Sequence, residues 1–258
     1  MTITRAQAGG STRWIGAAGA RIGFALALAG LVMLAAGPLG WRAGLMHYRI
    51  GLLYLLPGAA IAAGAAVLFS LAGLGWWRSL GRRPRILAAS GLVLGAAAFS
   101  VPLQANLARG RFPPINDITT DTANPPSFAA TVAARAAENG RPPDYDPEMG
   151  AQQRTAFPDI APVTTPLPPA EAFKRALAAA ESMSGWRIVA SDAASGRIEA
   201  SQSSLAYGFT DDVVIRVAAN GEGSRIDVRS KARQGRGDFG VNAKRVRAYL
   251  AALKEKLG

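Results

Sequence analysis

The chain has 258 residues and a formal net charge of +12, and half of its residues are hydrophobic. It contains no cysteine, which excludes disulfides, thiolate catalysis and Cys-ligated metal sites. A single histidine, His47, is too few for a His-rich metal site, and we expect neither a metal nor a cofactor.

The positive charge is concentrated in the N-terminal part of the chain. Residues 1–116 contain eleven arginines and no acidic residue, and the first carboxylate is Asp117. Residues 117–258 are nearly neutral, with eighteen Lys and Arg against seventeen Asp and Glu. Because this part has almost no excess of cations, bulk charge gives no reason to expect a nucleic-acid partner, and we expect none.

Three stretches contain no charged residue, namely residues 22–41, 50–77 and 86–108. A helix needs about 20 apolar residues to cross the hydrocarbon core of a bilayer. All three stretches are long enough, and they are rich in Ala, Leu and Gly, as membrane helices tolerate. The sequence therefore predicts a three-helix transmembrane region over residues 22–109, with spans at about 22–41, 50–74 and 86–105.

The third span carries a GxxxG pattern, "GLVLG", formed by Gly91 and Gly95. Such glycines allow two helices to approach closely, and we expect packing within the chain before dimerisation. No ionisable residue lies inside a predicted span, whereas proton relays and ion pathways usually contain one. A role as an accessory subunit of a membrane transporter is therefore only a further alternative.

The arginines also predict the orientation of the spans. Four of them fall in the connection 78–85, "RSLGRRPR", and the positive-inside rule places this connection in the cytoplasm. The N-terminal segment, residues 1–21, carries Arg5, Arg13 and Arg21 and is expected on the same side. Three spans then place the C-terminal part outside the cytoplasm. We interpret the first span as an uncleaved anchor, although "LAAGPLG" also offers the small residues of a signal-peptide cleavage site.

Residues 110–167 form a proline-rich segment. Twelve of the sixteen prolines fall between Pro113 and Pro169. A segment of this length without regular structure is typical of a linker or of a chain that wraps a domain. Its apolar side chains favour wrapping, and they are Phe128, Tyr145, Phe157 and Ile160.

Residues 168–258 are predicted to fold as a helix, a four-stranded antiparallel sheet and a second helix. Four runs have strand-like alternation, and they are "WRIVAS", "GRIEASQS", "DDVVIRVAA" and "SRIDVRSKAR". The alternation turns apolar side chains toward the helices and leaves a cationic face that we expect to be open to solvent. The fold class is therefore a membrane protein with three transmembrane α-helices and a C-terminal α+β domain.

Four ordered motifs carry a resemblance to a known family. The stretch "DVRSKARQGRGDFGVNAKRVRAYL" resembles the C-terminal signature of the bacterial family called domain of unknown function 1499. "NDITTD" followed by "NPPSF", then "FPDIAP" and "GFTDDVVIRV", are similar to its other landmarks, so the resemblance covers about residues 112–257. It implies a compact α+β domain and implies no reaction. With the orientation above, it leads us to expect a bacterial inner-membrane protein with a periplasmic domain.

The cations of the predicted sheet face are the first candidate site. Alternation places them on one face, where they could bind an anion, and they are Arg216, Arg225, Arg229, Lys231 and Arg233. Lipid head groups or an acidic envelope polymer fit this face better than nucleic acid, because base-stacking aromatics are not interleaved with the cations. The competing interpretation is an ordinary solvated face with cross-strand ion pairs.

The second candidate site consists of carboxylates that fall in or beside the family landmarks. Two of them could meet as an acid/base pair or hold a hard cation, and the candidates are Asp117, Asp121, Asp159, Asp211, Asp212 and Asp238. The competing interpretation gives each a structural role, such as Asp238 or Asn242 capping the last helix after the "GRGDFG" turn.

These observations identify no catalytic residue. We expect a non-catalytic binding or envelope-assembly protein whose partners are the lipid bilayer and an anionic envelope component or another membrane protein. A carboxylate- or metal-dependent envelope hydrolase is the alternative, and whether the chain is an enzyme stays open.

Overall fold

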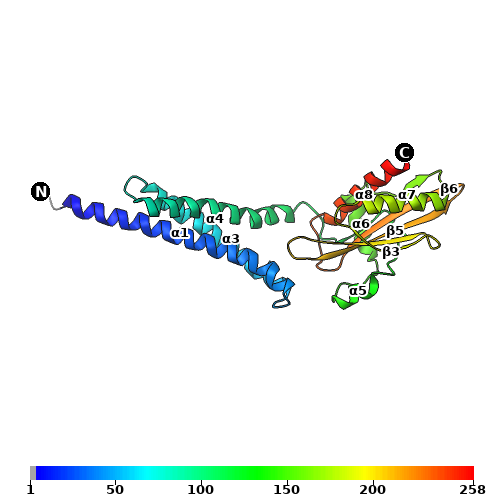
Figure 1. The fold of residues 1–258 in the computed structure, drawn as a ribbon, viewed down its shortest axis with the longest axis horizontal. Helices are drawn as coiled ribbons and strands as arrows, with labels where there is room; N and C mark the ends of the chain where they lie inside the picture. Colours follow the sequence, from blue (N-terminus) through cyan, green and yellow to red (C-terminus); the bar gives the residue numbers. More distant parts are fainter. Residues whose placement is uncertain (1–3) are drawn as a thin grey trace. The chain divides into compact units, whose positions relative to one another are not determined.

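The computed structural model describes residues 4–258, with side chains from residue 13 onward, and the chain divides into two compact units (Figure 1). The first unit is Met1–Arg109 and the second is Gly110–Gly258. Residues 1–3 of the predicted cytoplasmic segment 1–21, and the side chain of Arg5, lie outside the described part.

The described part of the first unit consists of helices joined by short connections. Its elements are α1 (Thr4–Arg42), α2 (Tyr48–Ile50), the π-helical turn η1 (Gly51–Leu55), α3 (Leu56–Gly75) and α4 (Arg82–Arg109). Within the described part of the chain, three helical stretches are long and apolar enough to cross a membrane, and they are Arg13–Arg42, Tyr48–Gly75 and Arg82–Arg109. The expectation of three such helices is confirmed.

Small residues bring α1, α3 and α4 close together. A Cβ atom on Gly91 would lie 2.6 Å from Ser70 Oγ and 2.8 Å from the backbone nitrogen of Phe24. A Cβ atom on Gly95 would lie 3.2 Å from the carbonyl oxygen of Ala63. The GxxxG pattern therefore packs within the chain, where only glycine leaves room for the neighbouring backbone.

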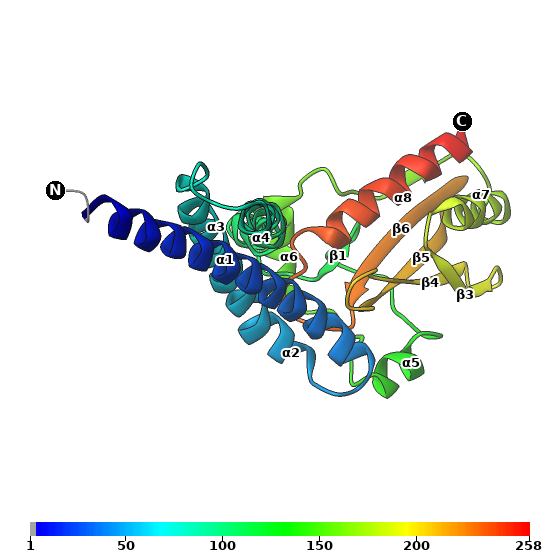
Figure 2. The ribbon, with the colours of Figure 1, turned by 60° about the vertical axis from the view of Figure 1, so that its left-hand side comes forward.

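The second unit is an α+β domain built on one antiparallel sheet (Figure 2). In chain order its elements are β1 (Asp117–Thr119), α5 (Val132–Ala137), α6 (Pro147–Ala156), β2 (Val163–Thr165), α7 (Pro169–Ser182), β3 (Arg187–Asp192), β4 (Arg197–Ser203), β5 (Thr210–Asn220), β6 (Gly223–Ala232) and α8 (Val241–Leu257). The strand order is β1-β6-β5-β4-β3, and β2 also pairs with β6.

The sheet has six strands, so the prediction of four is wrong. The two additional strands come from the proline-rich segment, and each is only three residues long. Both pair with the outer edge of β6, with Asp117 opposite Lys231 and Val163 opposite Ile226. They satisfy backbone groups that an open edge would expose. Gln153 of α6 then closes part of the new edge, because its side-chain amide bonds both the N–H and the C=O of Thr119.

The apolar face of the sheet packs against α7 and α8, as predicted (Figure 2). Ile198, Ile215 and Val228 are fully buried beneath the two helices. Tyr249 of α8 stacks on Trp186 with ring centroids 5.6 Å apart and donates a hydrogen bond to the carbonyl of Ala176 in α7. The core therefore lies between the sheet and this helix pair.

The opposite face of the sheet is covered, so the expectation that it is open to solvent is wrong. Residues 120–146, which we call the covering segment, cross this face, and α5 lies on the side away from α7 and α8 (Figures 1 and 2). Arg229, Lys231 and Arg233 are 2%, 5% and 2% exposed. The physical reason is that the covering segment and the flanking strands carry the partners of these cations.

Candidate functional site: a buried charge network

The charge network consists of Asp117, Arg135, Asp212, Arg229, Lys231 and Arg233. Strand alternation places Arg229 and Lys231 of β6, and Arg233 directly after the strand, on one face of the sheet. The register then puts Asp117 of β1 and Asp212 of β5 on either side of Lys231, in one row across three strands. The network is thus an outcome of strand pairing, with opposite charges directly facing one another.

Asp117 binds two of the cations. Its two carboxylate oxygens accept hydrogen bonds from Nε and Nη2 of Arg229, both at 2.8 Å. The ammonium of Lys231 lies 3.1 Å from Asp117 Oδ2. This is the bidentate geometry in which a guanidinium binds a carboxylate most strongly. Asp117 has no exposed surface, so the contact is made away from water.

Asp212 binds the other two cations. Arg233 donates from Nε and Nη2 to its carboxylate, and the closest contact is 2.7 Å. Arg135, which comes from α5 in the covering segment, reaches the same carboxylate at 2.7 Å. Arg233 also contacts Glu138 of the covering segment. Asp212 therefore links the sheet to the segment that covers it.

Backbone carbonyls and aromatic rings of the covering segment complete the network. Arg229 donates to the carbonyls of Pro126 and Pro143. Its guanidinium lies 4.9 Å from the ring centroid of Phe128 and 5.3 Å from that of Tyr145. Cation–π contacts of this kind hold a desolvated guanidinium favourably.

Burial sets the acid–base properties of the network. Burial lowers the pKa of Lys231, against the charge of Asp117, and also lowers the pKa of Arg135. Burial, with the charge of Asp117, raises the pKa of Tyr145 to about 12. A lysine with a lowered pKa can act as a general base, but Lys231 donates to Asp144 O and Asp117 and is 5% exposed. The arrangement occupies the ammonium group and gives a substrate no approach to this lysine.

A second ion cluster lies nearer the surface on the same face. Asp227 is 1% exposed and bonds both Arg216 and Arg225. Asp121 of the covering segment bonds the same two arginines, at 3.1 and 2.9 Å. Two cations and two carboxylates balance here, so the cluster is a closed set of ion pairs.

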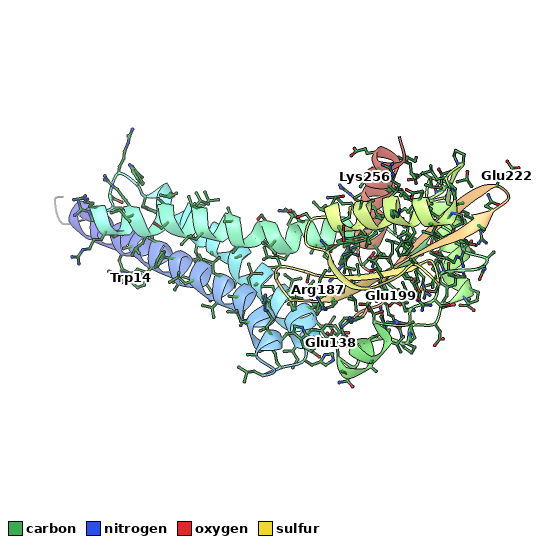
Figure 3. The ribbon with its side chains drawn as sticks, turned by 45° about the vertical axis from the view of Figure 1, so that its right-hand side comes forward. Trp14, Glu138, Arg187, Glu199, Glu222 and Lys256 are labelled. Atoms are coloured by element: carbon green, nitrogen blue, oxygen red, sulfur yellow. The ribbon has the colours of Figure 1, made fainter. Side chains whose placement is uncertain are left out.

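Sequence reasoning missed the role of Glu199. It is 1% exposed and accepts hydrogen bonds from the backbone N–H groups of Ala129, Ala130 and Thr131, and from the Thr131 hydroxyl. Figure 3 shows Glu199 and Glu138 on the side of the sheet away from α8. A carboxylate on the same sheet face as the candidate cations was the signal, because a buried charge needs partners.

The remaining candidate carboxylates occupy separate places. Asp238 accepts from the backbone N–H groups of Gly240 and Asn242, so it caps the start of α8, as one interpretation of the sequence expected. Asp159 forms an exposed bidentate pair with Arg247. Asp211 lies 2.7 Å from Arg245, and burial raises its pKa against that opposing charge. Each has a structural partner of its own.

The other candidates for chemistry are not grouped into a centre. His47 accepts a hydrogen bond from the backbone N–H of Arg49, at the N-terminus of α2. Among the described residues, no group of three or more His, Cys, Asp and Glu side chains could hold a metal ion. A hollow of about 360 Å³ beside β1 is lined by Thr120, Gln153 and Arg154, among others, with no carboxylate.

Comparisons with known proteins found one family model and several solved structures that resemble part of the chain. A family model described as "Protein of unknown function (DUF1499)" matches residues 117–253. The solved structures it resembles include the crystal structure of Ara h 8.0201, with 19% identity, 37% of this chain and 94% of that chain covered, and a TM-score of 0.29. The crystal structure of TTHA0849 from Thermus thermophilus shows 13% identity, coverage of 38% and 94%, and a TM-score of 0.24. At these TM-scores the likeness supports no inference. No curated protein matches the chain.

Proposed function

We infer that this chain, which belongs to the DUF1499 family of proteins of unknown function, is a membrane-anchored binding or assembly protein of the bacterial envelope and not an enzyme. The observation that carries this proposal is the occupation of every candidate carboxylate. Five of the six bond cationic side chains, and the sixth caps a helix.

A hydrolase would need two carboxylates that face a common substrate. Such carboxylates work about 5–10 Å apart, with room for substrate between them. Asp117 and Asp212 are two strands apart, which is about 10 Å, but Lys231 stands between them in the same row. Neither carboxylate has exposed surface, and both are saturated by cations. The geometry therefore favours a structural role for this pair.

The proposed location is the inner membrane, with the second unit in the periplasm. It is supported by three helices of membrane-spanning length and by the four arginines of the connection 78–85. Moving arginines across a membrane is unfavourable, so the arginine-rich connection is retained in the cytoplasm. An odd number of spans then puts the N-terminus and the domain on opposite sides.

Reporter fusions test this topology. A reporter that is active only outside the cytoplasm should be active when fused after Gly258, and a reporter that needs the cytoplasm should be inactive there. The same pair inserted in the connection 78–85 should give the opposite pattern and is the control. A cytoplasmic signal after Gly258 would overturn the proposed location.

The closed ion pairs also bear on the kind of partner. Three of the five cations expected to bind an anion are buried, and the other two, Arg216 and Arg225, bond Asp121 and Asp227. An anionic polymer would have to displace these carboxylates. Of the two expected partner classes, we therefore propose another membrane protein.

The partner proposal predicts two results for the full chain. In mild detergent extracts, native electrophoresis should show it in an assembly heavier than the purified chain in the same detergent. Heparin serves as a polyanion probe for the purified protein in zwitterionic nanodiscs. The native chain and its Arg225→Glu variant should bind heparin equally weakly. The Lys256→Glu variant, changed on the exposed part of α8, is the charge-matched control. The proposal would be contradicted if the chain migrated as a monomer and if it bound heparin in a way that Arg225→Glu abolished and Lys256→Glu did not.

A further inference from the structure

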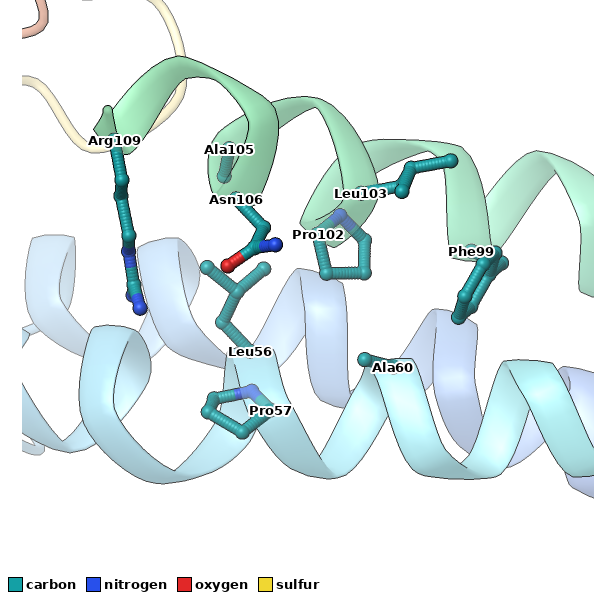
Figure 4. A pocket seen from close by; sticks show the side chains of 9 residues that line it. All are labelled: Leu56, Pro57, Ala60, Phe99, Pro102, Leu103, Ala105, Asn106 and Arg109. Atoms are coloured by element: carbon teal, nitrogen blue, oxygen red, sulfur yellow. The ribbon is translucent and has the colours of Figure 1, made fainter. Parts of the chain in front are cut away.

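An open cavity of about 280 Å³ lies between α3 and α4 in the first unit (Figure 4). Its walls are apolar and are formed by Leu56, Pro57, Ala60, Phe99, Pro102 and Leu103. At one end it is bordered by two polar residues, Asn106 and Arg109, whose side chains reach from α4 toward α3 (Figure 4). The cavity is therefore amphipathic along the direction of the helices.

The packing of the two helices explains the opening. At Gly91 and Gly95 the helices approach so closely that a Cβ atom would meet their neighbours. Toward the other end, proline rings occupy the facing positions Pro57 and Pro102, and the π-helical turn η1 directly precedes α3. Ala60 is too small to fill the space between them. Proline rings and a π-turn both disturb regular helix geometry, so the helices leave a groove here.

The polar border lies at a depth suited to a lipid head group. Arg109 is the last residue of α4 and follows Pro102 by seven residues, which is about 10 Å along a helix axis. Residues 1–116 contain no carboxylate that could neutralise it. An arginine at the end of a spanning helix directs its charge toward the phosphate region of the bilayer, while the wall below it is in contact with acyl chains.

We propose that this groove binds an anionic glycerophospholipid. One acyl chain lies along the apolar wall, and the phosphodiester oxygens accept hydrogen bonds from the guanidinium of Arg109 and the amide of Asn106. The cavity volume approaches the lower end of the range of ligand pockets, about 300 Å³, and an open side along the helices leaves room for the rest of the chain. This inference rests on the proposed membrane location of the first unit.

Charge complementarity distinguishes this occupant from an apolar helix of a partner. A helix would fill the wall but would leave Arg109 without an anion, whereas a phospholipid matches both the wall and the border. A basic residue near the membrane surface favours an anionic lipid by about five-fold over a neutral one. The site should therefore prefer phosphatidylglycerol to phosphatidylcholine with the same acyl chains.

Native mass spectrometry of the full chain released from detergent micelles tests the head-group contact. Titration with each lipid should show a first phosphatidylglycerol bound about five-fold more tightly than phosphatidylcholine. Arg109→Gln should reduce phosphatidylglycerol binding to the level of phosphatidylcholine. Arg111→Gln, a matched change two residues beyond the helix, should retain the preference. Equal binding of the two lipids, or equal loss in both variants, would overturn the proposal.

A second pair of variants tests the groove itself. Ala60→Leu fills the apolar wall and should weaken both lipids, whereas Ala97→Leu, at an exposed position of α4 outside the groove, should weaken neither. Unchanged lipid binding in Ala60→Leu would show that lipid contacts only the charged surface and not the groove. If the native chain retained a partner protein in the groove in place of lipid, the groove would be assigned to that partner. Both results contradict a phospholipid site. Failure of the topology test would leave lipid binding in micelles unaffected, so the two proposals fail separately.

Discussion

Replacing Asp117 by asparagine is expected to destabilise the second unit by about 3–5 kcal/mol, because removing one partner of a buried ion pair leaves uncompensated charge. Here two cations lose their carboxylate at once, since Arg229 and Lys231 both bond Asp117. The new amide would also present an N–H₂ group to cationic donors. The free energy of unfolding is measured by titrating the full chain in micelles with urea. At each urea concentration, a short pulse of trypsin detects the unfolded fraction by cleavage in the covering segment.

Asp159→Asn is the matched control for this change. It removes a carboxylate with equally good bidentate geometry to Arg247, but in a pair whose side chains are 54% and 42% exposed. An exposed pair contributes about 0–1 kcal/mol, so the control should remain close to the native stability. A similar loss in the two variants would show that burial of the charge network does not hold the covering segment in place.

Replacing Gly91 by alanine is expected to have the second-largest effect, through the packing of the three long helices. The new methyl group would lie 2.8 Å from the backbone nitrogen of Phe24 and 2.6 Å from Ser70 Oγ. Overpacking typically costs about 1–3 kcal/mol, and a clash with backbone cannot be relieved by a rotamer change. The measurement is the thermal midpoint of unfolding of the full chain in micelles. Tryptophan fluorescence is the signal, because it comes mainly from the first unit.

Gly75→Ala provides the comparison, because a Cβ atom there meets no heavy atom within 4 Å. Alanine is the better helix former by about 1 kcal/mol in a helix interior, where Gly91 lies, and by less at Gly75, the last residue of α3, so propensity alone would lower neither thermal midpoint. The expected result is a lower midpoint for Gly91→Ala and an equal or higher one for Gly75→Ala. A higher midpoint in both would mean that α1, α3 and α4 can separate at Gly91 without loss.

Local periodicity made the helices and the apolar side of the sheet predictable. Charge-free stretches of 20 residues or more identify helices of membrane-spanning length without any knowledge of their neighbours. Alternation along β5 and β6 likewise turned Val213, Ile215 and Val228 toward α7 and α8, where they are buried. The β1 and β2 strands gave no such signal, because three residues are too few to show a period, and prolines directly flank β2.

The charge network escaped prediction because its partners are far apart along the chain. Arg229 and its carboxylate Asp117 are 112 positions apart, and no spacing rule connects them. The same cations that suggested an open anion-binding face proved to be buried under the covering segment. Residue types on a strand face indicate what the face can bind, but not whether the chain itself supplies the ligand.

By itself, therefore, the sequence determined three helices long enough for a membrane and the apolar side of the sheet, because these follow from local composition and period. The approximate limits of the family domain came from the resemblance of its motifs to the family. Only the tertiary structure decided how the charges are used. Strand register brought Asp117, Lys231 and Asp212 into one row, and the covering segment added Arg135 above it. Desolvation makes unpaired charge costly in such a place, so the cations are consumed in holding the domain together.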